Sequence, residues 1–183
     1  EQCFKLNVAV LSIDDFYKTH QERIDLSKTL HPLLLTRGVP GSHDLSLAYN
    51  TLNELSKLTE HSSCIIPTFN KAMDDRESAE NWKTVSGPID IIVLEGWCVG
   101  VSAQPEDALK EPINTLEHDE DKTCVWRKLI NEQLKTEYAD FYAQIDDLIV
   151  LQAPSFECVY EWRLLQESKL IERSKHEKSN GHL

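Results

Sequence analysis

The sequence predicts an α/β fold in which strands and helices alternate around a mainly parallel sheet. The clearest strand is the run at residues 89–94, which is apolar apart from Asp90 and lacks alternation of apolar and polar residues. Such a run is typical of a parallel strand with both faces covered. A second apolar run, residues 6–13, precedes a polar segment with helical character at residues 19–30. Strands that alternate with helices in this way predict a doubly wound sheet.

The spacing of apolar residues predicts the other elements. One helix is expected to start at residue 45 and another to cover residues 123–144, because apolar positions recur there at helical intervals. Residues 64–67 and 148–151 predict two more strands, and a final helix is expected to begin near residue 156. A length of 183 residues fits one domain with a substantial core, so we predict a single domain over residues 1–183.

Composition excludes several classes of protein. A formal net charge of −12 argues against a nucleic-acid-binding protein, because no basic face is evident to neutralise phosphates. No apolar run reaches the length of a membrane span, and no signal-peptide pattern opens the chain. The five cysteines are scattered without a C-x-x-C pair, which suits neither a zinc site nor a disulfide framework. We therefore expect a cytoplasmic protein without a structural metal and without nucleic-acid or membrane partners.

Acidic residues follow both of the clearest strands. Glu95 comes directly after the run 89–94 and is followed by Gly96, while Asp14 and Asp15 follow the run 6–13. In open α/β sheets ligands bind beyond the carboxyl ends of the strands, so these acids predict a polar cleft. The alternative is that each acid ends a strand and caps the next element. From the residues alone, the function is that of an enzyme or binding protein with an acidic cleft.

Two loops carry further polar residues. The loop 37–44 contains a Pro-Gly turn with Arg, Ser, His and Asp, which are suited to a polar ligand. For Ser42 and Asp44 the alternative is capping of the helix that starts at residue 45. The loop 68–76 mixes charges of both signs, and it faces either solvent or a substrate. In the last helix Arg163 stands four residues before Glu167, so an ion pair on the helix surface is the simplest interpretation.

Several segments, taken in order, are characteristic of one family. The most distinctive is Arg37-Gly38-Val39-Pro40-Gly41-Ser42-His43-Asp44. The others are residues 12–17, 69–72, 75–76, 94–100, 112–114, 162–163 and 166–167. Together these segments resemble the P-loop kinases of the glycerate 3-kinase type, relatives of uridine kinase, phosphoribulokinase and bacterial pantothenate kinase. The resemblance runs over nearly the whole chain, and the ordered set is far more specific than any one segment.

This resemblance implies a P-loop NTPase-like, doubly wound, mainly parallel sheet with helices on both faces. It also implies transfer of the γ-phosphoryl group of ATP to a hydroxyl of glycerate or a similar small hydroxy acid, with ATP and Mg²⁺ as cofactors. Asp14 matches the acid that faces the acceptor hydroxyl and is expected to act as a base or to orient that hydroxyl. Glu95 is expected to organise Mg²⁺ through water. Arg163 is expected to approach the phosphates from a lid-like helix.

The resemblance implies contacts with the acceptor from seven residues, of which the cations suit a carboxylate. They are Asp15, Tyr17, Arg37, His43, Asp44, Lys71 and Arg76. One departure is Asn70, which stands where the family usually has Asp. The alternatives are a non-catalytic remnant that binds a small molecule or a protein partner, and a kinase for a nucleoside or a pantothenate-like acceptor.

The second departure concerns the phosphate loop. The family carries G-x-x-x-x-G-K-[ST], and none of the six glycines of this chain forms that motif. We therefore expect a fragment that is incomplete at both ends: the phosphate-loop strand and helix are missing before residue 1, and the C-terminal helix is truncated.

Residues 1–183 on their own are expected to be inactive, because nothing in them cradles a triphosphate. We expect a dissociation constant for ATP of about millimolar or weaker by calorimetry, and no ADP release above background with any acceptor. Tight, Mg²⁺-dependent binding of ATP would show instead that another part of the chain supplies the phosphate site.

Overall fold

The structure is a computed structural model that describes residues 4–180. It contains two compact units, Glu1–Asp146 and Asp147–Leu183. Among the described residues, the first unit holds all the strands and most of the helices, and the second consists of a connecting segment and one long helix. That the chain forms a single domain stays a prediction.

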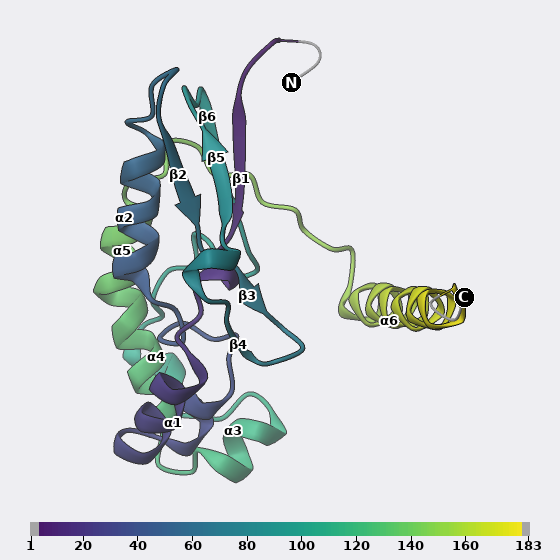
Figure 1. Cartoon of the computed structure of the whole chain (residues 1–183). Coiled ribbons are helices and arrows are strands. Elements are labelled where there is room, and N and C mark those ends of the chain that lie inside the picture. The colour runs from purple at the N-terminus through teal and green to yellow at the C-terminus, as the bar shows by residue number, and fades with distance from the viewer. Residues whose placement is uncertain (1–3, 181–183) are drawn as a thin grey trace. The chain divides into compact units, whose positions relative to one another are not determined.

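A pair of parallel strands forms the centre of the first unit (Figure 1). Strand β1 (Val8–Ser12) pairs with β6 (Ile91–Glu95), and the register runs from Val8 opposite Ile91 to Ser12 opposite Glu95. Both predicted strands are thus confirmed, and they point the same way. Because parallel strands end at the same edge of a sheet, the acids that follow them lie on one side of the molecule.

Two antiparallel pairs complete the strands of the described chain. Strand β2 (Ser63–Ile66) pairs with β5 (Lys83–Ser86), which confirms the strand expected at residues 64–67. Strands β3 (Phe69–Asn70) and β4 (Asp75–Arg76) pair as a short hairpin. The sequence predicted only a loop at residues 68–76. The hairpin brings this charged segment back on itself, so that its tip carries Lys71 to Asp74.

The helices of the first unit are short. They are α1 (His20–Thr29), α2 (Leu45–Leu55), α3 (Thr115–Glu120), α4 (Val125–Lys135) and α5 (Glu137–Tyr142). Four 3₁₀ turns join them to the strands: η1 (Ile13–Phe16), η2 (Pro32–Leu35), η3 (Ala79–Asn81) and η4 (Glu106–Leu109). The helices expected at residues 19–30 and from residue 45 are confirmed.

The single helix predicted over residues 123–144 is wrong, because the structure has two helices there. The break lies at Thr136, whose ψ of −95° is outside the helical region. Its backbone N–H bonds the carbonyls of Glu132 and Gln133, and its hydroxyl donates to Glu132 O at 2.7 Å. The backbone N–H and the hydroxyl of Thr136 thus bond carbonyl groups in the last turn of α4, and α5 begins after this residue in a different direction. The apolar positions keep their spacing across the break, and so the pattern concealed it.

The core lies between the strands and one layer of helices (Figure 1). Leu11 and Ile13 belong to the same buried cluster as Ala48 and Leu55 of α2 and Phe141 of α5. Side chains alternate along β1, so the opposite face carries Val10, which is 67% exposed. On β6, Ile91 and Val93 are likewise exposed, at 43% and 41%. The sequence predicted cover on both faces of this run, and within the first unit one face is more open than the other.

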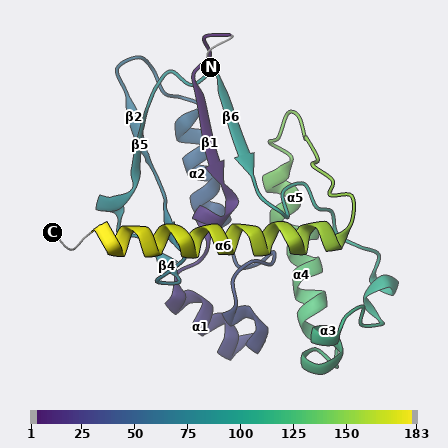
Figure 2. The same ribbon diagram turned by 90° about the vertical axis from the view of Figure 1, so that its right-hand side faces the viewer.

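The second unit contains α6 (Phe156–Asn180), which begins where the sequence predicted. The strand predicted at residues 148–151 is wrong: the segment pairs with no other strand in residues 4–180, and its side chains are 51–94% exposed. An apolar, β-branched sequence favours extended backbone, but a strand also requires a neighbour to receive its hydrogen bonds. Figure 2 shows the length of α6. No helix in the described part of the chain is long and apolar enough to cross a membrane.

Gly96, which directly follows β6, packs closely against Ile13 of η1, and we predict that Gly96→Ala destabilises the first unit. A Cβ at this position would lie 2.4 Å from Cγ2 of the fully buried Ile13 and 3.2 Å from Cγ2 of Val99. Overpacking of this kind costs about 1–3 kcal/mol. Urea unfolding of the purified chain measures the loss, with the exposed Ser102→Ala as the control. Equal stability of the two variants would contradict the packing described here.

Candidate active site

The carboxyl ends of β1 and β6 position the first two acids of the site. Asp14 lies in η1 directly after β1, where the hydroxyl of Ser12 accepts a hydrogen bond from the Asp14 N–H at 3.4 Å. Glu95 is the last residue of β6 and is exposed. Because Ser12 and Glu95 are register partners, the two acids are brought to the same edge from positions 81 residues apart.

The carboxylate of Asp14 receives two hydrogen bonds from side chains. The hydroxyl of Tyr17 donates to Oδ1 at 2.8 Å, and the ammonium of Lys71 donates to Oδ2 at 2.7 Å. Burial raises the pKa of Asp14, but these donors and the charge of Lys71 outweigh burial, so the pKa lies below its ordinary value. Asp14 is therefore ionised at neutral pH, which is the form that a base or an orienting acceptor requires.

Tyr17 is a buried support of Asp14. Its ring stacks on His43 with 4.6 Å between centroids and meets Phe69 edge to face at 5.3 Å. Burial and the hydrogen bond to Asp14 raise the pKa of Tyr17, so the phenol stays protonated and stays a donor. The sequence placed Tyr17 among the acceptor contacts, and the structure places its hydroxyl on the Asp14 carboxylate.

His43 is almost completely buried and belongs to a hydrogen-bonded chain. Its Nδ1 lies 2.6 Å from the hydroxyl of Tyr138, which also accepts the N–H of Gly41 at 2.8 Å. Burial lowers the pKa of His43 to about 4, so the imidazole is neutral at pH 7. Nε2 of His43 is buried without a hydrogen-bond partner among the described residues. Tyr138 lies among the helically spaced residues of the segment 123–144, whose pattern does not distinguish it as a residue of the site.

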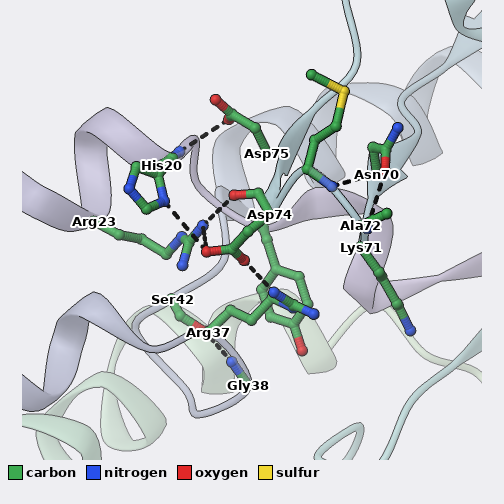
Figure 3. Close-up of polar contacts among 12 residues, drawn as sticks. His20, Arg23, Arg37, Gly38, Ser42, Asn70, Lys71, Ala72, Asp74 and Asp75 are labelled. Carbon is green, nitrogen blue, oxygen red and sulfur yellow. Dashed lines mark hydrogen bonds and ion pairs between the residues drawn. The ribbon is translucent and has the colours of Figure 1, made fainter.

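The β3–β4 hairpin connects to the loop 37–44 through ion pairs (Figure 3). Asp74 at the tip pairs with Arg37, and its Oδ2 lies 3.0 Å from a guanidinium nitrogen of Arg23. Both guanidinium groups lie over the ring of Phe69: the distance from Cζ to the ring centroid is 5.5 Å for Arg37 and 5.9 Å for Arg23. Arg23 and Asp74 are site residues that the sequence did not single out, because they lie on a polar helix and in a charged loop.

Arg76 and Asp44 form a second link between these segments. Nη2 of Arg76 donates to the carbonyl of Tyr17 at 2.8 Å and to Oδ2 of Asp44 at 3.2 Å. The other oxygen of Asp44 accepts the N–H of Leu47 at 3.0 Å, which confirms that Asp44 caps α2. Ser42 does not cap the helix, since its hydroxyl donates to the carbonyl of Val39 at 2.6 Å.

Asp15 and Asn70 shape the hairpin. Oδ1 of Asp15 accepts the N–H of Phe69 at 3.1 Å, which anchors the start of β3. Oδ1 of Asn70 accepts the N–H groups of Ala72 and Met73, at 3.0 and 3.1 Å, as an aspartate at this position would. Asn70 therefore retains a turn-forming oxygen at the position where the family usually has Asp.

The structure brings together most of the residues predicted for the site. Asp14, Tyr17, His43 and Lys71 form one group around the Asp14 carboxylate. Each cation predicted to hold the acceptor is also paired with an acid of the chain: Arg37 with Asp74, Lys71 with Asp14, and Arg76 with Asp44. Among the residues whose side chains the structure describes, no group of three or more metal-ligating side chains is present.

Arg163 belongs to the second unit. It lies on α6, where its side chain is 70% exposed and pairs with Glu167 at 3.6 Å. Its Nη1 also donates to Gln166 at 3.0 Å. The surface ion pair expected from the i, i+4 spacing is confirmed.

Comparisons with known proteins identify relatives of the chain. It is 34% identical over 170 residues to the chloroplastic D-glycerate 3-kinase of Arabidopsis thaliana, a match that covers 89% of this chain and 35% of that protein. It is 31% identical to mug58, an uncharacterized kinase of Schizosaccharomyces pombe, over 91% of this chain and 61% of that protein. The chain thus spans between about a third and three fifths of these curated relatives. No protein-family model matches it.

A solved structure confirms the fold. The D-glycerate 3-kinase from Cryptococcus neoformans var. grubii superposes with a TM-score of 0.80 at 28% sequence identity. The superposition covers 96% of this chain and 64% of that chain. The α/β class predicted from the alternation of strands and helices is confirmed, and so is the resemblance to kinases of the glycerate 3-kinase type.

We predict that the stability lost in Tyr17→Phe depends on pH. The donors on Asp14 lower its folded-state pKa, so their contribution is present above the unfolded pKa and is lost as the pH falls through the folded pKa. A hydrogen bond to a charged group contributes about 1.5–3 kcal/mol. Tyr17→Phe is therefore expected to lower the free energy of unfolding by about that amount at neutral pH and by less in acid.

Urea unfolding of both proteins between about pH 7 and pH 3 measures this difference. Tyr49→Phe is the matched control, because Tyr49 is 51% exposed and no hydrogen bond of its hydroxyl is found among the described residues. A loss in Tyr17→Phe that stays constant over this range would contradict the assigned bond to an ionised Asp14.

Proposed function

We propose that this chain, which is homologous to part of the kinases of the glycerate 3-kinase type, is the acceptor-binding part of an ATP-dependent kinase. The reaction is the transfer of the γ-phosphoryl group of ATP to a hydroxyl of glycerate or a similar small hydroxy acid. The observation that carries the proposal is the ionised Asp14 at the end of β1, held by Tyr17 and within reach of the hairpin. The use of ATP is supported by TDA10, a probable ATP-dependent kinase of Saccharomyces cerevisiae that is 28% identical over 91% of this chain and 58% of that protein.

Asp14 is the group that meets the acceptor hydroxyl. Tyr17 holds Oδ1 from the buried side, which leaves Oδ2 as the oxygen that turns toward a ligand. Lys71 occupies Oδ2 in this structure, but its side chain is 62% exposed, so a hydroxyl can replace it without disturbing the core. An acceptor hydroxyl bound there donates its proton to Oδ2 as the phosphoryl group is transferred.

Arg37 is the residue best suited to an acceptor carboxylate. It pairs with Asp74 through Nη1 alone, and its side chain is 30% exposed. The guanidinium therefore keeps further N–H groups that can form a two-point contact with a carboxylate. The ring of Phe69 lies against the guanidinium and limits its orientation.

Glu95 fits a magnesium ion that is held mainly by water and substrate. Its carboxylate is exposed at the sheet edge and has no hydrogen-bond partner in the described part of the chain. Mg²⁺ typically takes one or two carboxylates and completes its shell with water and phosphate oxygens. The ion, when bound, neutralises charge on the transferred phosphoryl group. Arg163 is proposed to approach the same phosphates from α6.

The acceptor specificity is tested on the intact protein. A panel of D-glycerate, uridine and pantothenate is expected to give the highest kcat/KM with D-glycerate, because Arg37 has N–H groups for a carboxylate beside the Asp14 site. ADP release with each acceptor is the measurement. A clear preference for the neutral nucleoside would overturn the assignment of the acceptor, while the proposal that the protein is a kinase would be unaffected.

The role of Asp14 is tested by a paired substitution. Asp14→Asn is expected to lower kcat by roughly two or more orders of magnitude with little change in ATP affinity, because the amide cannot take the proton. Asp15→Asn is the control, since Asp15 accepts only a backbone N–H of the hairpin and its amide oxygen retains that bond. A large loss in Asp15→Asn with Asp14→Asn nearly unaffected would assign the reacting group to Asp15.

A further inference from the structure

Asp74 connects the two arginines beside the acceptor site, and no role follows for it from the proposed chemistry. Its carboxylate pairs with Arg37 through Oδ1 and lies 3.0 Å from Arg23 through Oδ2 (Figure 3). Burial raises the pKa of Asp74, and the hydrogen bonds from Arg23 and Arg37 outweigh it, so the group is ionised at neutral pH. The imidazole of His20 also lies 3.2 Å from Oδ2.

Arg23 fixes Asp74 and is not itself available to a ligand. The side chain is 1% exposed, and each of its three nitrogens is in use. Nε donates to the carbonyl of Lys18 at 3.3 Å, Nη1 to that of Leu35 at 2.8 Å, and Nη2 to the carbonyl of Asp74 at 2.6 Å. The backbone and the carboxylate of Asp74 are therefore both held by a buried, fully bonded arginine.

Asp74 in turn fixes Arg37. The carboxylate holds Nη1 of Arg37 while the ring of Phe69 lies against the guanidinium. Two guanidinium groups and one carboxylate leave a single positive charge in this cluster, and Arg37 is the more exposed of the two arginines, at 30% against 1% for Arg23. The single net positive charge of this cluster can neutralise one carboxylate of a ligand. A second carboxylate on the same ligand would find no unpaired positive charge in the cluster.

We infer that Asp74 is a specificity-determining residue: it orients Arg37 and restricts the acceptor site to hydroxy acids with one carboxylate. This inference rests on the proposed function and adds to it the charge of the acceptor. Asp74 achieves this through Arg37 without touching the acceptor itself. Removal of its charge leaves the arginines with two positive charges and relaxes the selection against dicarboxylates.

The experiment compares two acids in the intact protein. D-Glycerate is the acceptor, and tartronate, in which a second carboxylate replaces the hydroxymethyl group, is the competitive inhibitor. The measured quantity is the Ki for tartronate divided by the KM for D-glycerate. Asp74→Asn is expected to lower this ratio roughly three- to tenfold, the scale of one unit charge at a partly exposed ion pair.

The variants are chosen to keep the hairpin intact. Asp74 has a φ of +55°, which asparagine and glycine adopt readily, so Asp74→Asn and Asp74→Gly both preserve the turn and should give the same result. Asp74→Glu keeps the charge and should keep the ratio near that of the wild type. Asp75→Asn is the matched control: Asp75 neighbours Asp74, and its Oδ1 accepts the backbone N–H groups of His20 and Arg76.

The outcomes separate a selective role from a structural one. A lower ratio in Asp74→Asn with an unchanged ratio in Asp75→Asn supports the inference. An unchanged ratio, or a rise of Ki and KM by the same factor, overturns it, because Asp74 would then only hold the hairpin. A wild-type protein that does not phosphorylate D-glycerate overturns the proposed function instead, and the dissociation constants of the two acids by calorimetry then decide the charge selection without turnover.

Discussion

The parallel pairing of β1 with β6 is the constraint on which the candidate site depends. Its register sets Ser12 opposite Glu95, so the acids after the two strands reach one edge of the sheet. The residues that follow the two strands are also closely packed, because Gly96 lies so close to Ile13 that no side chain fits between them. The first turn after β1 then fixes Asp14 and Tyr17 relative to each other, since they are three residues apart in a 3₁₀ turn closed by a bond from Tyr17 N–H to Asp14 O.

Charge pairing determines how the rest of the site is arranged. Asp14, Asp44 and Asp74 each have a cationic partner from a different segment, because an ionised group removed from water is costly unless it is paired. The sequence predicted that the cationic side chains of the site bind the carboxylate of an anionic acceptor. In the structure these cations are already paired with carboxylates of the chain. Acceptor recognition therefore depends on N–H groups that remain exposed and on the displacement of side chains such as Lys71.

Buried polar groups give the site its rigidity. Tyr138 joins Gly41 to His43, and the His43 ring supports Tyr17, whose hydroxyl holds Asp14. The distinctive loop 37–44 is therefore connected to the carboxylate through stacked rings and hydrogen bonds. A neutral His43 costs less to bury than a charged one, and this agrees with its lowered pKa.

The features that depend on local chemistry could be predicted from the amino-acid sequence. The runs that became β1 and β6, the acids that follow them, the capping of α2 by Asp44 and the start of α6 at Phe156 all follow from residues close to one another in the chain. The family resemblance is of the same kind, because it was based on ordered short segments. The pairing of Asp74 with Arg23 and Arg37, and that of Tyr138 with His43, could not be predicted in this way, since the partners stand 37 to 95 residues apart and meet only in the folded chain. The break at Thr136 could not be predicted either, because the periodic apolar pattern continues unchanged where the helix direction changes. At residues 148–151 the apolar sequence favours a strand, but strand formation also requires a neighbouring strand.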